Sequence, residues 1–185
     1  MINQILKLPS DWHSLGSISN DVLNTILHYT KNIDVEHSLE TGAGKSTLLL
    51  SNISKHHLVF AIDKHNSISL VKYSPFFKKE NVEFIVGPTQ ITLPQFKFDF
   101  KVQLALIDGP HGYPFPDLEY YYIYQVLDTG ALLILDDIHI PSVKNMYKFI
   151  KKDQMFKLLT TRSKTAFFRR TNYPTFYSLG DGWWQ

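Results

Sequence analysis

The sequence has no cysteine among its 185 residues. A disulfide framework and a thiolate metal site are therefore excluded, and the composition suits a reducing compartment. No apolar stretch approaches the roughly 20 residues that span a bilayer, and the N-terminus lacks the pattern of a signal peptide. The formal net charge of +2 is too small to indicate a nucleic-acid or membrane surface. We expect a cytoplasmic protein that binds neither.

The length and an apolar content of 44% fit one domain with a sizeable core. We predict a single domain over residues 1–185, with a helical N-terminal segment over 1–30 and an aromatic tail over 171–185. In the N-terminal segment, Ser19, Asn20 and Asp21 offer N-cap chemistry for a helix. The sequence does not fix the oligomeric state, and a homo-oligomer is compatible with it.

Short apolar segments alternate with helical patterns along the rest of the chain. Continuous apolar strands indicate burial on both faces, and the alternation indicates a mostly parallel sheet with helices on both sides. We therefore predict an α/β fold, a Rossmann-like doubly wound sheet that ends in an antiparallel hairpin over 154–170. Strands are expected at 35–39, 58–62, 82–86, 102–107 and 131–135, and helices at 45–53, 117–127 and 143–151. Ligands in such sheets bind at the carboxyl ends of the strands.

The loop Leu-Glu-Thr-Gly-Ala-Gly-Lys-Ser-Thr, residues 39–47, allows two interpretations. Its Gly44-Lys45-Ser46 end is typical of a phosphate-binding P-loop, but that motif requires a glycine where Leu39 stands. The alternative begins at Glu40, an acid at a strand end before a glycine turn. Asp63 ends the next strand, about 20 residues on, where an acid can accept from ribose hydroxyls. Residues 40–44 with Asp63 favour an adenosine-type ligand.

A second dense segment, Asp108-Gly-Pro-His111-Gly-Tyr, follows the fourth predicted strand. An acid and a histidine beside a glycine turn are suited to proton transfer, so Asp108 and His111 are our candidate catalytic residues. Asp136 and Asp137 end the following strand. If the two strands pair, the three aspartates converge, which suits either a divalent cation or simple capping roles. His56 and His57 precede a strand, and we expect them to be exposed to solvent.

These motifs, with Ala-Ile-Asp63 and Leu-Asp-Asp137-Ile in the same order, resemble class I S-adenosylmethionine-dependent methyltransferases, most closely the small-molecule O-methyltransferase-like group called methyltransferase family 24. The resemblance covers about residues 35–170. It implies a seven-stranded sheet whose last strand is antiparallel, and a cofactor site at the strand ends. The implied cofactor-binding residues are Glu40, Thr41, Gly42, Gly44, Ser46, Asp63, Lys64, Thr89 and Asp108.

The resemblance also implies a reaction, the in-line transfer of a methyl group from S-adenosylmethionine to a hydroxyl of a small-molecule acceptor. In metal-dependent relatives, acids that match Asp108, Asp136 and Asp137 bind Mg²⁺. Those relatives often have Asp-Asn where this chain has Asp136-Asp137, which leaves the cation open. Two alternatives remain: a P-loop protein that binds ATP or GTP, and a binding module with this fold and no catalysis. Lys45 and the Trp183-Trp184 tail have no assigned role.

Overall fold

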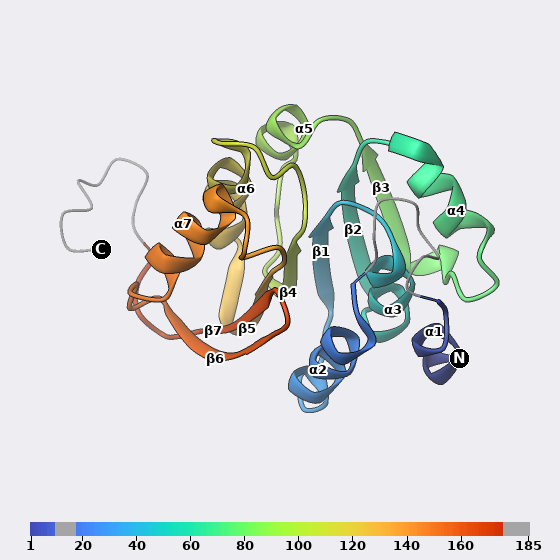
Figure 1. The fold of residues 1–185 in the computed structure, drawn as a ribbon, viewed down its shortest axis with the longest axis horizontal. Helices are drawn as coiled ribbons and strands as arrows, with labels where there is room; N and C mark the ends of the chain where they lie inside the picture. Colours follow the sequence, from blue (N-terminus) through green and yellow to red (C-terminus); the bar gives the residue numbers. More distant parts are fainter. Residues whose placement is uncertain (10–17, 176–185) are drawn as a thin grey trace.

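The protein, described by a computed structural model over residues 1–9 and 18–175, is built around one seven-stranded sheet. The strand order is β3-β2-β1-β4-β5-β7-β6 (Figure 1). The first five strands in this order, from β3 through β2, β1 and β4 to β5, pair in parallel. Strand β7 is antiparallel to both of its neighbours, β5 and β6. The strands are β1 His37–Thr41, β2 His56–Ala61, β3 Val82–Val86, β4 Val102–Ile107, β5 Leu127–Leu135, β6 Phe156–Arg162 and β7 Thr165–Arg170. The predicted fold class is confirmed.

Helices cover both faces of the sheet (Figure 1). On one face, α2 and α3 pack against the apolar side chains of β4, β5 and β7, with α1 and α4 beside them. On the other face, α6 and α7 bury a core rich in aromatic residues, and α5 contributes Leu93. The helices are α1 Ile2–Leu6, α2 Asn20–Thr30, α3 Lys45–Ile53, α4 Ser67–Tyr73, α5 Thr89–Gln95, α6 Phe115–Tyr124 and α7 Pro141–Ile150.

Most predicted elements lie where the sequence placed them, and Ser19 caps α2 by accepting from the Val22 amide at 3.4 Å. Two differences stand out. Helix α5 was not predicted, and the helix expected over 117–127 ends at Tyr124. Leu127, the last residue of that expected helix, lies in β5, because this strand starts four residues earlier than Ala131 and pairs with β4 from Val102. The Trp183-Trp184 tail lies outside the described residues.

The direction of strand order reverses between β1 and β4. From β1 the chain proceeds outward through β2 and β3, then returns to β4 and continues on the opposite side. The crevice outside the carboxyl ends of such a pair is the usual ligand site of an open α/β sheet. The loops after Thr41 and Ile107 therefore border the candidate site.

Candidate active site

A cavity of about 730 Å³ opens at this switch point. Its volume is within the range of small-molecule and cofactor sites. The wall is formed by the loops after β1, β2, β3, β4 and β5 and by the turn between β6 and β7. Of the predicted site residues, it includes Gly42, Gly44, Ser46, Lys64, Thr89, Asp108, His111, Asp136 and Asp137.

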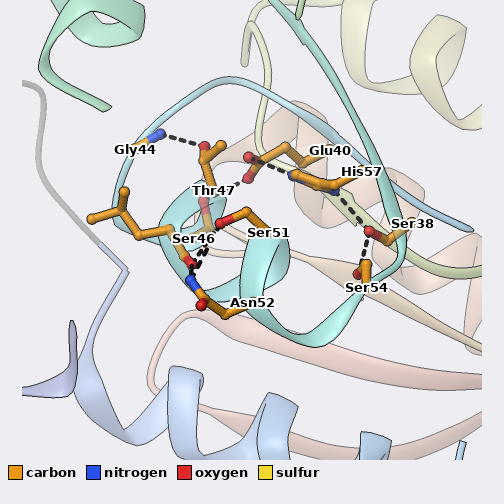
Figure 2. Close-up of polar contacts among 10 residues, drawn as sticks. Ser38, Glu40, Gly44, Ser46, Thr47, Ser51, Asn52, Ser54 and His57 are labelled. Carbon is orange, nitrogen blue, oxygen red and sulfur yellow. Dashed lines mark hydrogen bonds and ion pairs between the residues drawn. The ribbon is translucent and has the colours of Figure 1, made fainter. Parts of the chain in front are cut away.

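The glycine turn after β1 forms one side of the cavity. Gly42 has φ +90°, a left-handed conformation that glycine adopts without strain. Gly44 directly precedes α3, and its amide donates to Thr47 Oγ1 at 3.0 Å (Figure 2). The first amide groups of α3 lack partners within the helix, so this end of the helix favours a polar or anionic ligand group.

Glu40 lies beneath this turn and does not contribute to the cavity wall. It is 1% exposed and accepts from Ser46 Oγ at 2.6 Å. Its other oxygen lies 3.1 Å from His57 Nε2, and Ser38 links His57 to Ser54 (Figure 2). The expectation that His57 is exposed was wrong, since the side chain is buried between β1, β2 and α3. His57 belongs to β2, which is buried at every position from His57 to Ala61, whereas the strand was expected to begin at Leu58.

Lys45 is buried although it begins a helix. Its Nζ atom donates to the Leu8 carbonyl and to Asn20 Oδ1, each at 2.7 Å, and burial lowers its pKa. The ammonium thus holds the end of the α1 segment and the start of α2 against the glycine turn. In a P-loop the lysine side chain instead reaches the phosphates. This geometry removes the main support for the ATP or GTP alternative.

Asp63, the predicted ribose ligand, is exposed and serves as a cap for α4. Its carboxylate accepts from the Ile68 amide at 2.9 Å and from Ser69 Oγ at 3.1 Å. The neighbouring residues Ile62 and Lys64 lie in the cavity wall, but Asp63 does not. Its role in ribose binding stays a prediction.

Asp108, His111 and Asp137 gather at the far side of the cavity. His111 Nε2 lies 3.1 Å from Asp137 Oδ2 and 3.6 Å from Asp108 Oδ1. Burial raises the pKa of Asp108 to about 7, with Asp136 and Asp137 adding to the rise and His111 opposing it. The Asp108 carboxylate in turn raises the pKa of His111, which burial opposes. Near neutral pH the Asp108–His111 pair can therefore both hold and accept a proton, as acid–base catalysis requires.

The two aspartates after β5 point to different partners. Asp136 is buried, and Thr165 donates to its Oδ1. Asp137, with φ +54°, has its Oδ1 atom 2.5 Å from Lys164 Nζ. Asp108, His111 and Asp137 each offer one candidate ligand atom, and these atoms all lie within 4.8 Å of one another. Asp136 does not belong to this group. The three aspartates predicted as a metal site are thus not brought together as one ligand set.

Glu119 on α6 lies behind Asp108 and was missed by the sequence analysis. It is 1% exposed, and its Oε2 accepts from Thr41 Oγ1 at 2.8 Å. Thr41 Oγ1 in turn accepts from the Asp108 amide at 3.0 Å. Burial raises the pKa of Glu119 to about 7, and the hydrogen bond from Thr41 opposes this rise. Thr41 therefore supports the Asp108 loop from below, outside the cavity wall.

Comparison with known proteins agrees with this geometry. A family model described as a methyltransferase domain matches residues 39–138, which include the end of β1, the glycine turn, the Asp108 loop and β5. The chain belongs to methyltransferase family 24. The match covers more than half of the chain and confirms the resemblance seen in its motifs. No curated protein sequence matches it.

Solved structures with the same fold come from several kinds of methyltransferase. The O-methyltransferase TomG from Streptomyces achromogenes, involved in tomaymycin synthesis and solved with S-adenosylmethionine, gives a TM-score of 0.73 at 11% identity, over 92% of this chain and 89% of TomG. An O-methyltransferase from Bacillus cereus, solved with S-adenosylhomocysteine, gives 0.68 at 14% identity, over 92% and 90% of the two chains. An rRNA methylase from Streptococcus thermophilus gives 0.60 at 13% identity, over 80% and 95%. At such low identities these similarities establish the fold and leave the acceptor open.

Among residues 1–9 and 18–175, no helix has the length and apolar character needed to cross a bilayer.

Proposed function

We propose that this family member transfers the methyl group of S-adenosylmethionine to a hydroxyl of a small molecule. One observation carries the proposal: the cavity at the β1/β4 switch point joins a glycine turn to the Asp108–His111 pair. The turn supplies close backbone approach for a cofactor. The pair supplies a proton acceptor for a hydroxyl nucleophile.

In the proposed complex, the methionine part of the cofactor lies along Gly42–Gly44. Lys64 and Thr89, after β2 and β3, border the adenosine part, since both lie in the cavity wall on that side of the sheet. Glu40 acts from beneath, where it fixes Ser46 and the start of α3. Gly42–Gly44 would thereby hold the methyl donor beside the Asp108 loop, which follows β4 next to β1.

The chemical step is an in-line displacement, so the protein contributes mainly alignment and removal of a proton. The acceptor oxygen attacks the methyl carbon, and the carbon–sulfur bond breaks with its electron pair remaining on sulfur. The hydroxyl proton passes to the Asp108–His111 pair. The products are a methyl ether and S-adenosylhomocysteine.

Calorimetric titration with S-adenosylhomocysteine and with ATP tests the cofactor. We expect binding of S-adenosylhomocysteine in the micromolar range, about −8 kcal/mol, and none of ATP. Tight ATP binding without S-adenosylhomocysteine binding would overturn the proposal. A screen of hydroxylated acceptors with isotope-labelled cofactor then tests the acceptor class, with short rRNA fragments as the competing class. Methylation of RNA alone would refute a small-molecule acceptor.

A further inference from the structure

The side chains near Asp108 do not fit the divalent cation that some relatives use. Asp136 has its Oδ1 atom engaged by Thr165, and Asp137 has its Oδ1 atom engaged by Lys164. A cation held by Asp108, His111 and Asp137 would lie close to the Lys164 ammonium group, because that group already contacts Asp137. The charges of the ammonium and the metal would repel each other.

Lys164 is held in this position by the fold. It lies in the turn between β6 and β7, and its carbonyl accepts from the Ile138 amide at 2.9 Å. The next residue, Thr165, is buried and donates to Asp136. Together with the Lys164–Asp137 ion pair, these contacts fasten the hairpin turn to the loop after β5 at three places.

The Lys164 ammonium also faces the site where the reaction is expected. Lys164 lies in the wall of the same cavity as Gly42, Asp108 and His111. Its partner Asp137 lies 3.1 Å from His111, so the ammonium and the proposed proton acceptor flank one carboxylate. A hydroxyl oxygen that reaches the Asp108–His111 pair would therefore approach the ammonium as well.

We propose that Lys164 is the resident cation of this site and takes the place of a divalent metal ion. The proposal rests on the proposed methyl transfer. As the acceptor hydroxyl gives its proton to the Asp108–His111 pair and attacks the methyl carbon, negative charge develops on its oxygen. The Lys164 ammonium stabilises that charge by hydrogen bonding. No metal-bound intermediate and no further co-reactant is required.

The first test uses cation binding and needs no acceptor. Mn²⁺ is titrated into wild type, Lys164→Gln and Lys164→Arg, and bound ion is measured by electron paramagnetic resonance. Removing the ammonium leaves two carboxylates and a histidine with an excess of negative charge, so we expect Lys164→Gln to bind Mn²⁺ at least about tenfold more tightly than wild type. Lys164→Arg keeps the positive charge and should resemble wild type. Wild-type binding as tight as that of Lys164→Gln, and lost in Asp137→Asn, would overturn the proposal.

The second test uses turnover once an acceptor is in hand. Wild-type activity should not change in chelator, and Lys164→Gln should lose roughly 100-fold in kcat, the size expected for one charged donor in a transition state. Lys164→Arg should recover part of that loss. Lys157→Ala changes an exposed lysine on the neighbouring strand β6 and serves as the matched control. Full activity of Lys164→Gln, or abolition of wild-type activity by chelator, would overturn the proposal.

Binding of S-adenosylhomocysteine separates this proposal from the one on which it rests. All Lys164 variants should bind it as wild type does, because the turn lies on the acceptor side of the cavity. If no protein binds it, the proposed function fails, whereas the Mn²⁺ titration still reports whether Lys164 occupies the cation position.

Discussion

The backbone of Gly42 lies directly against the carbonyl oxygen of Asp108. A Cβ atom at position 42 would lie 2.6 Å from this oxygen, and Gly42 also has φ +90°. The glycine turn after β1 and the acidic loop after β4 are therefore packed backbone to backbone. This close approach brings the proposed cofactor turn and the proposed proton acceptor together in one cavity.

Gly42→Ala should disrupt both loops, because neither the φ angle nor the space accommodates a side chain. We expect a loss of roughly 2–4 kcal/mol in the free energy of unfolding, from backbone strain and overpacking, and at least a tenfold loss in S-adenosylhomocysteine affinity. Urea denaturation and calorimetry measure the two effects.

Gly44→Ala is the matched control within the same turn. Gly44 has φ −177°, and a Cβ atom there meets nothing within 4 Å. The variant should unfold at nearly the same urea concentration as wild type. Equal destabilisation by the two substitutions would contradict the packing argument.

Glu119→Gln should change the dependence of stability on pH. Folding raises the pKa of Glu119 from its ordinary value of 4.5 to about 7, so the folded protein binds an extra proton between these values. The contribution of Glu119 to the free energy of unfolding is therefore highest below pH 4.5 and falls as the pH rises to 7. Above pH 7 the buried charge costs about 3 kcal/mol, which glutamine avoids while retaining the hydrogen bond from Thr41.

The check is urea denaturation of wild type and variant at pH 5 and pH 8. The variant should gain stability relative to wild type at pH 8, and most of this gain should be absent at pH 5. A difference that is the same at both values would show that Glu119 does not titrate in this range. Substitution of Asp108 is unsuitable as a control in this experiment, because burial raises the pKa of Asp108 to about 7 as well.

The sequence predicted the sheet and the strand-end residues well, for a physical reason. A strand that is buried on both faces can be recognised in the sequence as a continuous apolar run, without knowledge of its neighbours in the sheet. Polar residues at the carboxyl ends of such strands indicate the edge where ligands bind. Gly42, Asp108 and His111 were found in this way, and the structure brings all three to one cavity.

The missed residues depend on contacts between distant segments. Lys164 forms its ion pair with Asp137 only because β7 pairs with β5 in antiparallel register. Glu119 contacts the Asp108 loop through Thr41 only because α6 packs over β4. The misplaced helix end at Leu127 has a similar origin. Leu127 was assigned to a helix by local pattern, but pairing with Val102 of β4 makes it part of a strand.

Lys45 and Asn20 should show measurable energetic coupling. The bond between Lys45 Nζ and Asn20 Oδ1 is 2.7 Å long and partly buried, and it joins α2 to the glycine turn. A double-mutant cycle with Lys45→Met and Asn20→Ala should give about 1–2 kcal/mol of coupling, as expected for a hydrogen bond with a charged donor. Urea denaturation of the four proteins provides the cycle.

Lys144→Met replaces an exposed lysine on α7 and controls for the loss of one positive charge. Paired with Asn20→Ala, it should give no coupling. Coupling of the same size in both cycles would mean that the effect comes from net charge rather than from the hydrogen bond.

Glu40→Ala tests whether the acid at the end of β1 has a structural role in addition to its expected role in cofactor binding. Its removal leaves the buried Ser46 hydroxyl and His57 ring without their acceptor, so we expect a loss of about 3 kcal/mol in the free energy of unfolding. Glu36→Ala, four residues earlier, removes an exposed ion pair with Lys55 and should cause no measurable change. If Glu40→Ala unfolds like wild type and only S-adenosylhomocysteine binding weakens, Glu40 acts on the cofactor and the buried chain from Ser46 to Ser54 does not stabilise the fold. A parallel loss of stability and binding is the expected result, since the same contacts fix the start of α3 beneath the glycine turn.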